Sequence, residues 1–287
     1  MIRDVAVIVP AANEEHRIAR CLTSIEVAAR HLSQRHPGIQ SRVVVALDRC
    51  TDATAAICAT FPAVTTVTTT TRNVGAARRA GTLAALSNPA GPDGELWLAS
   101  TDADSAVPAD WLTAMITAAG RGAGLVLGTV LPGSGLSPAA RAQWLARHHL
   151  RDGHPYVHGA NLGLRADAYR ALGGWRPLAT GEDTDLARRA AAAGWLPIAR
   201  TAAIPVVTST RRTGRAPRGF SSYLRALSGP GRSAGTGEAD LDGAADLAGL
   251  ERRLRGGRGP AGHGPVGDAE HAPVPGAGQA AARPPAR

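Results

Sequence analysis

The sequence contains no lysine, and all 32 of its basic side chains are arginine. Only 3% of its residues are aromatic, and no run of basic residues is interleaved with aromatics, which argues against nucleic acid as a partner. No stretch of about 18 uninterrupted apolar residues occurs, so no segment is expected to span a membrane. The apolar run in the N-terminal segment MIRDVAVIVP is too short for a signal peptide.

The three cysteines, Cys21, Cys50 and Cys58, are odd in number and form no CxxC pair. This argues against a disulfide framework and against a zinc ribbon, and it favours a reducing compartment. The histidines between positions 148 and 158 match no standard zinc motif either. We therefore expect a soluble cytoplasmic protein.

The sequence does have enough apolar content for a core, at 44% of residues, most of it Ala, Val and Leu. Its net charge of +9 comes from residues 1–227, which hold 25 arginines against 16 acids, whereas residues 228–287 hold seven of each. A basic body fits a phosphorylated substrate or an anionic membrane surface. Residues 228–287 also hold 14 glycines and 7 prolines, which predicts a disordered tail apart from a short helix that the pattern allows at 239–254.

Short β-rich runs alternate with helical patterns through the first half of the chain. Four strand–helix units in series favour an α/β fold with an open, mostly parallel sheet, in which ligands bind beyond the carboxyl ends of the strands. Beyond residue 131 the alternation loosens. The predicted strands are 5–9, 42–47, 64–70, 96–100, 124–131, 160–165 and 203–208, and the predicted helices begin near residue 13 and cover 55–61, 75–86, 107–120, 138–150, 166–172 and 184–193.

Polar clusters follow the first three strands. The segment 10–15 (PAANEE) is either a proline stop with a helix cap or a ligand loop. After the second strand, Asp48 can accept hydrogen bonds from a base or ribose, or cap the next helix. The third cluster, 72–79, has a glycine that lets the backbone approach a ligand, and Arg78 and Arg79 lie one helical turn further along, unless they belong to a solvated helix face.

Two acidic clusters are candidates for chemistry. Asp102 and Asp104 directly follow the apolar strand LWLAS, and carboxylates at that edge suit a hard divalent cation, Mg²⁺ or Mn²⁺, shared with phosphate oxygens. Glu182 and Asp183 open a predicted helix, where the dipole favours acids whatever their role, and one of them can act as a general base. Arg211 follows the last predicted strand, where a phosphate can lie.

Taken in order, these clusters resemble the family 2 glycosyltransferases of the GT-A fold. VIVPAANEE resembles the first strand and loop of that family, and DRCTDAT is similar to its D-x-S-x-D-x-T stretch, with Cys50 in place of serine. RNVGAARRAG resembles the N-x-G-x-x-x-A-R segment, with the arginine slightly early. TDAD resembles the metal-binding D-x-D motif, HGANLGLR the G-x-N acceptor segment and GEDTDL the E-D motif. The match covers about residues 5–225.

The resemblance implies a Rossmann-like GT-A domain at 1–227, with a nucleotide-sugar-binding half (1–131) and an acceptor-binding half (132–227). The metal would be held by Asp104 and Asp102, and the catalytic residues would be Asp183, as the base of an inverting reaction, and Glu182. The residues implied at the donor site are Pro10, Asn13, Glu15, Asp48, Arg78, Arg79, Asp102 and Asn161. Arg211, which follows the last predicted strand, is assigned to the same site.

The implied partners are a nucleotide diphosphate-sugar donor and a hydroxyl acceptor, which is a small molecule, a glycan or a lipid-linked species, with peripheral membrane contact left open. Three alternatives remain. A retaining GT-A glycosyltransferase would share the D-x-D motif. A GT-A-like nucleotidyltransferase would open with a glycine-rich loop and a basic residue, which PAANEE lacks. A non-catalytic sugar-nucleotide binder would be indicated by loss of Asp104 or Asp183, and both are present.

Overall fold

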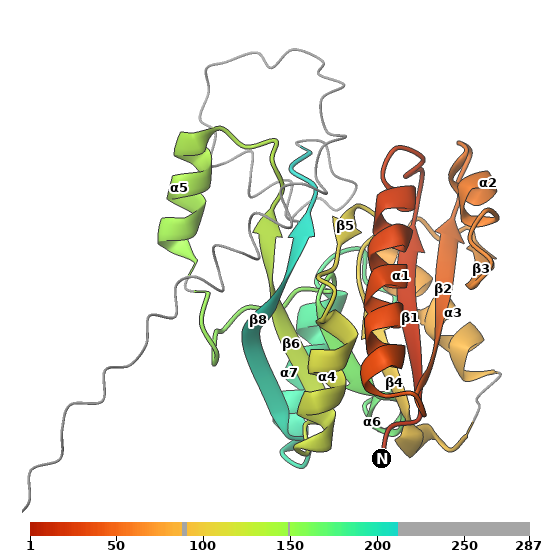
Figure 1. Cartoon of the computed structure of the whole chain (residues 1–287), viewed down its shortest axis with the longest axis vertical. Coiled ribbons are helices and arrows are strands. Elements are labelled where there is room, and N and C mark those ends of the chain that lie inside the picture. Colours follow the sequence, from red (N-terminus) through yellow and green to blue (C-terminus); the bar gives the residue numbers. More distant parts are fainter. Residues whose placement is uncertain (88–90, 149, 212–287) are drawn as a thin grey trace, which may run out of the picture. The chain divides into compact units, whose positions relative to one another are not determined.

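The computed structural model describes residues 1–87, 91–148 and 150–211. The predicted tail, with its short helix at 239–254, lies outside these residues. Strands and helices alternate along the chain, as the sequence predicts (Figure 1). In order they are β1 (Asp4–Ala11), α1 (Ile18–Arg35), β2 (Gln40–Asp48), α2 (Thr54–Cys58), β3 (Val64–Thr69), α3 (Val74–Leu86), a 3₁₀ turn (Asp93–Glu95), β4 (Leu96–Ser100), β5 (Ser105–Ala106), α4 (Trp111–Gly120), β6 (Leu125–Pro132), α5 (Pro138–Arg147), β7 (Leu162–Arg165), α6 (Ala166–Ala171), α7 (Glu182–Ala193) and β8 (Ile198–Thr208).

The strands form one sheet in the order β3-β2-β1-β4-β7-β6-β8-β5. Pairing is parallel from β3 to β4 and again between β6 and β8. Two strands run the other way: β7 is antiparallel to β4 and β6, and β5 is antiparallel to β8. The mostly parallel α/β sheet expected from the sequence is thereby confirmed.

The antiparallel strand β7 has a consequence for the ligand edge. Its first residue, Leu162, pairs with Ser100, the last residue of β4. The segment just before β7 therefore lies at the carboxyl end of β4, next to Asp102. Residues from the two halves of the chain meet at this edge because both halves contribute strands to the same sheet.

The first strand is buried on both faces, as its continuous apolar run predicts. Val5, Val7 and Val9 point to the face covered by α1 and α4, and Ala6 and Ile8 to the face covered by α3 and α6. In Figure 1, α1 and α4 lie side by side on one face of the sheet. No helix of the described residues is both long and apolar enough to cross a membrane.

Several element boundaries differ from the sequence-based expectation. The first helix begins at Ile18 rather than near Asn13, because Asn13 has a left-handed backbone (φ 54) and its side chain binds the next loop. The last strand starts at Ile198 instead of 203, and α5 ends at Arg147 instead of 150. The two-residue strand β5 was not predicted, since it is too short to give a period.

Candidate active site

Three loops at the carboxyl ends of β1, β2 and β3 each contain a non-glycine residue in the left-handed region. These residues are Asn13 (φ 54), Arg49 (φ 53) and Arg72 (φ 49). This conformation is costly for residues with a Cβ, and it persists only where the surroundings hold it. Such positions gather at ligand sites, and here all three lie at the edge where α/β sheets bind ligands.

Hydrogen bonds join the loop after β1 to the loop after β2. Asn13 Oδ1 accepts from the Thr51 backbone N–H at 2.7 Å, and Glu15 Oε2 accepts from the Ala53 N–H at 2.9 Å. Pro10 lies inside β1, half-buried and in register with Ala46. Asn13 and Glu15 are thus at the predicted edge, and their side chains fix the shape of the two loops.

Asp48, at the end of β2, is 6% exposed and organises the loop after β3. Its carboxylate accepts hydrogen bonds from the Thr69 hydroxyl (2.9 Å) and from the backbone N–H groups of Thr71 (2.8 Å), Arg72 (3.1 Å) and Asn73 (3.0 Å). These four bonds hold Arg72 in its left-handed conformation. Asp48 therefore caps a loop, and not the helix that follows it in the chain.

Arg78 is the centre of the site, with a side chain only 2% exposed. Its Nε donates to Glu182 Oε1 at 3.0 Å, its Nη2 donates to Asp102 Oδ1 at 2.5 Å, and its Nη1 donates to the Ser100 hydroxyl. Burial alone lowers the pKa of Arg78, but the carboxylates of Asp102, Glu182 and Asp183 raise it above the usual arginine value. The guanidinium therefore stays charged and links the loop after β4 to the first turn of α7.

Close packing around α3 fixes Arg78. Asn73 caps α3 by accepting from the Ala76 N–H at 2.9 Å, and its Nδ2 donates to the Pro177 carbonyl at 2.9 Å. Gly75 meets the backbone of residues 176–178, where a Cβ would collide with the Arg176 carbonyl. By contrast Arg79 is exposed, so of the two arginines expected at the donor site the structure brings only Arg78 into the cluster.

Asp104 is paired with an arginine from the far end of the described chain. Arg211 Nη2 lies 3.1 Å from Asp104 Oδ2, and Arg211 Nη1 donates to Glu14 Oε1 at 2.6 Å. Pairing of β5 with β8 brings the two segments together, and the Ser209 N–H donates to the Asp104 carbonyl at 3.1 Å. Arg211 thus lies beside Asp104, one of the two predicted metal ligands.

The carboxylates at this edge fit a hard divalent cation. Burial raises the pKa of Asp104 to about 6; Arg211 opposes this rise, and the nearby charges of Asp102 and Glu14 add to it. A bound cation would relieve that repulsion. No three His, Cys, Asp or Glu side chains of the described residues converge on one point, so the protein would supply two carboxylates and leave the other positions to phosphate and water oxygens, as is common for Mg²⁺.

The first turn of α7 presents two acids in different settings. Glu182 is 5% exposed and bonded to Arg78; burial raises its pKa, and Arg78 opposes the rise. Asp183 is half-buried, and its Oδ2 accepts from the Gly159 N–H at 2.7 Å. A Cβ at Gly159 would lie 2.5 Å from Arg78 Nη2, so only glycine lets this backbone approach both Arg78 and Asp183.

Asn161, expected at the donor site, is instead part of the core. It is fully buried, its Oδ1 accepts from Trp111 Nε1 at 2.9 Å, and its Nδ2 donates to the carbonyls of Thr129 (2.8 Å) and Ile204 (2.7 Å). These bonds use its whole amide group to join β6, β8 and α4. The structure thus does not bring Asn161 to the cluster, because β7 turns this side chain inward.

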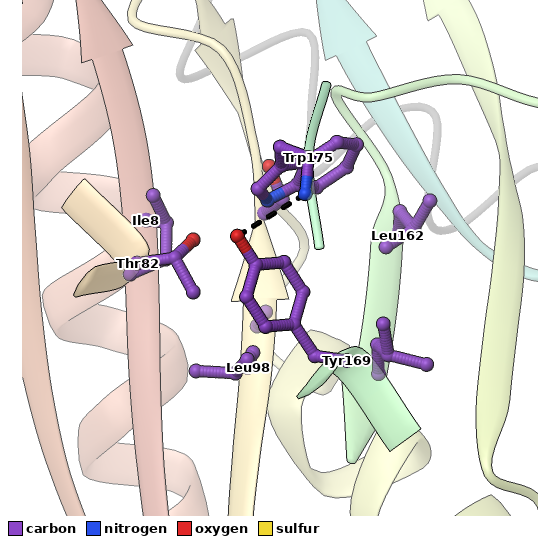
Figure 2. A pocket seen from close by; sticks show the side chains of 9 residues that line it. Ile8, Thr82, Leu98, Leu162, Tyr169 and Trp175 are labelled. Atoms are coloured by element: carbon purple, nitrogen blue, oxygen red, sulfur yellow. Dashed lines mark hydrogen bonds between the residues drawn. The ribbon is translucent and has the colours of Figure 1, made fainter. Parts of the chain in front are cut away.

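A small cavity lies between β1, α3, β4, β7 and α6, next to Ser100 and Trp175 of the site. It measures about 10 Å³, room for one water molecule, and is lined by residues including Tyr169 and Trp175 (Figure 2). The Tyr169 hydroxyl accepts from the backbone N–H of Trp175 at 3.2 Å, and the Arg78 guanidinium lies 5.6 Å from the Trp175 ring centroid. This cavity is a packing void under the site and is too small for a nucleotide.

Four contributors to the site were not singled out from the sequence: Glu14, Ser100, Gly159 and Trp175. Glu14 and Ser100 carried a usable signal, because Glu14 lies between Asn13 and Glu15 and Ser100 ends β4 two positions before Asp102. Trp175 comes from a segment without regular structure, and nothing in its local sequence indicates a contact with Arg78.

The chain is similar in sequence to a known family and in fold to solved structures. Residues 6–172 match the sequence model described as Glycosyl transferase family 2. The solved structure of the mannosyltransferase PcManGT from Pyrobaculum calidifontis, in complex with GDP-Man and Mn²⁺, is similar with a TM-score of 0.53 and 20% identity, over 89% of this chain and 76% of that chain. No curated protein sequence matches the chain.

The structure of TarS from S. aureus is similar with a TM-score of 0.52 and 14% identity, over 72% of this chain and only 36% of the TarS chain. This chain therefore spans about a third of that relative. At these identities the solved structures show a common fold, and they do not identify a substrate.

Proposed function

This chain belongs to glycosyl transferase family 2, and from that premise we propose that it transfers a sugar from a nucleotide diphosphate-sugar to a hydroxyl acceptor, with the help of Mg²⁺ or Mn²⁺ and with inversion at the anomeric carbon. A nucleotide-sugar donor and a divalent metal agree with the GDP-Man and Mn²⁺ bound by PcManGT. The acceptor is a small molecule, a glycan or a lipid-linked alcohol.

One observation carries the proposal: Arg78 ties the metal-binding loop to the helix that carries the base. It bonds Asp102 on one side and Glu182 on the other, and these are the near neighbours of Asp104 and Asp183. A sugar-diphosphate between the two acidic groups would have its phosphates on the side of Asp104 and its anomeric carbon facing Asp183. A preorganised arrangement of this kind favours the transition state of a transfer reaction.

We assign the donor end of the site to Asp102, Asp104, Arg78 and Arg211. When bound, the divalent cation neutralises charge that develops on the leaving nucleotide diphosphate. Asp104 and Asp102 would hold it, and the two arginines balance the remaining negative charge. Arg211 suits this role because its guanidinium is already beside Asp104 at 3.1 Å and can form forked bonds with phosphate.

At the acceptor end, Asp183 takes the proton. The acceptor oxygen attacks the anomeric carbon as its hydrogen passes to Asp183, and the bond between that carbon and the diphosphate oxygen breaks with its electron pair on the leaving group. Glu182 has a different role, because its bond to Arg78 at 3.0 Å commits it to holding the guanidinium. Of the two residues expected to be catalytic, Asp183 is the base and Glu182 is a positioning residue.

Thermal unfolding with UDP- and GDP-sugars in the presence of Mn²⁺ tests the donor assignment. A donor present at about 100 times its dissociation constant should stabilise the fold by about 2.7 kcal/mol, seen as a rise in melting temperature of several degrees. Asp104→Asn should remove most of this effect. Asp110→Asn is the matched control, since Asp110 is another acid of this region and makes no capping hydrogen bond to α4.

If Asp104→Asn and chelator both leave donor binding and transfer at the wild-type level, the metal assignment is wrong. Stereochemistry is tested separately, by following the anomeric proton of the fresh product by NMR. A product with the donor's configuration would replace the inverting mechanism with the retaining alternative while leaving the transferase assignment in place.

A further inference from the structure

Five ring side chains from α5, its C-cap and the segment before β7 form a cluster centred on Tyr156, here called the ring stack: Trp144, His148, Tyr156, His154 and His158. The Trp144 and His148 rings are stacked with centroids 4.0 Å apart and planes 6° apart. Tyr156 lies 5.2 Å from His148, 5.7 Å from His154 and 6.2 Å from His158, measured between centroids. The cluster holds three of the nine histidines of the chain.

The ring stack ends at the proposed base. His158 directly precedes Gly159, whose backbone N–H donates to Asp183 Oδ2 at 2.7 Å. The antiparallel pairing of Leu162 with Ser100 places this segment at the carboxyl edge of the sheet, where the donor residues lie. A molecule resting on the ring stack beside His158 would therefore lie close to Asp183.

His158 differs from the other two imidazoles of the stack. His148 Nδ1 lies 2.8 Å from the Trp144 carbonyl, and His154 Nε2 lies 3.2 Å from the Thr201 carbonyl. Neither ring nitrogen of His158 has a hydrogen bond to any described residue. Burial lowers its pKa to about 4; Asp183 opposes this, and His154 and His148 add to it. At neutral pH His158 is thus a neutral imidazole that can donate and accept.

Two other polar atoms of the stack are buried without a partner among the described residues, Trp144 Nε1 and His154 Nδ1. Both residues are only 1% exposed, so these two atoms lie beneath the surface of the stack and are available to a buried water only. The half-buried Tyr156 ring and the His158 imidazole are the parts of the stack that a ligand can reach, and they combine an apolar face with polar atoms, as is usual in a site for a small organic molecule.

Two arginines near the stack donate to backbone carbonyls. Arg200 Nη1 donates to the carbonyls of His154 and Tyr156, both at 3.2 Å. Arg141 Nη1, on α5, donates to the carbonyls of Pro132 (3.2 Å) and Gly133 (3.3 Å). At this end of the stack His158 is neutral and Asp183 is an acid bonded to the neighbouring Gly159, which favours an uncharged acceptor over a phosphorylated or carboxylated one.

We propose that the ring stack is the acceptor subsite and that its acceptor is an uncharged carbohydrate ring. The C–H face of the sugar packs on the face of Tyr156, and His158 forms a hydrogen bond to the acceptor that directs one hydroxyl at Asp183. That hydroxyl gives its proton to Asp183 and its oxygen bonds to the anomeric carbon of the donor, while His158 keeps its own protons. This inference rests on the proposed function, and it adds the class of acceptor and the surface that selects it.

Saturation-transfer NMR on the full chain, with Mn²⁺ replaced by diamagnetic Mg²⁺ and with UDP or GDP added, tests this. The probes are methyl α-glucopyranoside and methyl α-mannopyranoside, with glycerol as a hydroxylated probe that has no ring. The ring protons of a methyl glycoside should receive saturation, and those of glycerol should not. Tyr156→Leu and His158→Ala should each weaken glycoside binding about tenfold, the loss expected for one stacking or hydrogen-bonding contact.

Two conservative variants separate a local role from general damage. Tyr156→Phe keeps the ring and should keep the saturation signal, and His158→Gln should bind the glycoside more tightly than His158→Ala because it restores a hydrogen-bonding group. His36→Ala is the control for removal of an imidazole, since His36 follows the far end of α1. Nucleotide titration by calorimetry on the same samples reports the donor site independently.

Normal nucleotide binding with no saturation of either glycoside would overturn the acceptor class and leave the transferase assignment standing. Equal signals from wild type, Tyr156→Leu and His158→Ala would show that the glycoside binds elsewhere, as would a glycerol signal as strong as that of the glycosides. Failure of every nucleotide to bind would instead overturn the proposed function, and the inference with it.

Discussion

Arg78 and Glu182, 104 positions apart in the chain, form a buried ion pair with Nε and Oε1 3.0 Å apart. The same guanidinium bonds Asp102, so one side chain sets the spacing between the loop after β4 and the start of α7. A buried arginine with two carboxylate partners is stable only while all three groups are present, because each unpaired charge would be costly in the core. The geometry of the site and the stability of the fold are therefore coupled at this residue.

Arg78→Ala should lower the free energy of unfolding by about 3–5 kcal/mol, because it leaves the Glu182 carboxylate buried without its partner. Arg79→Ala is the matched control: the same side chain is removed from the next position of α3, where it is exposed, and the change should stay within about 0.5 kcal/mol. Urea unfolding followed by circular dichroism measures both. Similar losses in the two variants would show that the pair with Glu182 contributes little.

Asp48→Ala should release the loop after β3, because its carboxylate accepts three backbone N–H bonds and one hydroxyl bond there. We expect a loss of about 2–3 kcal/mol in stability, since hydrogen bonds to a charged group are lost and Arg72 is freed from its left-handed conformation. Nucleotide affinity should fall as well, and calorimetry with UDP and GDP measures it. Asp48→Ala with unchanged affinity would separate this loop from the donor site.

Asp183→Asn should abolish transfer while donor binding survives, because the amide keeps the size of the side chain and its bond to the Gly159 N–H but cannot take a proton. The loss should appear in kcat, by about 100-fold or more, with little change in melting temperature. Steady-state kinetics and a thermal melt on the same protein check both statements. Collapse of donor affinity in place of kcat would move Asp183 to the donor site.

The sequence predicts the sheet and the position of the acidic motifs well, because these follow from local patterns. Apolar runs define the strands, and the loop at their carboxyl ends must lie at the ligand edge, so Asp102 and Asp104 arrive there for topological reasons. Arg78 also had a readable signal: Gly81, Thr82 and Ala85 lie three, four and seven positions further on, and all are on the buried face of α3. Four positions after Arg79 lies Leu83, which is exposed.

Other parts of the site depend on which strands pair, and local sequence does not carry that information. The contact between Arg211 and Glu14 exists because β5 pairs with β8, and β5 has only two residues. Asn161 resembles a family motif in sequence, yet its amide joins β6, β8 and Trp111 in the core. The direction in which a side chain points at a strand end is set by the tertiary pairing of that strand.

Asp185, on the first turn of α7, should contribute to the stability of the fold in a strongly pH-dependent way. Asp185 Oδ2 accepts from Arg189 Nε at 2.9 Å, and Oδ1 lies 3.2 Å from Arg176 Nη1. Burial raises the pKa of Asp185. Hydrogen bonding and charge from Arg189, together with Arg176 and Arg188, lower it by more than burial raises it, so the net shift is downward. A carboxyl with a depressed pKa stabilises the folded state only while it is ionised.

Asp185→Asn should therefore cost about 2 kcal/mol at pH 7, the value of hydrogen bonds to a charged group. The difference from wild type should hold down to the ordinary aspartate pKa of about 3.9, and it should shrink as the pH falls below that value through the lower pKa of the folded state. Urea unfolding of both proteins at pH 7, 5, 4 and 3 measures it. Because Asp185 bonds arginines that hold the start of α7 and not the reacting atoms, kcat should change far less than in Asp183→Asn. A stability difference that stays constant from pH 7 to pH 3 would mean that Asp185 acts through shape and neutral hydrogen bonds, and the ion pairs with Arg176 and Arg189 would then contribute nothing measurable.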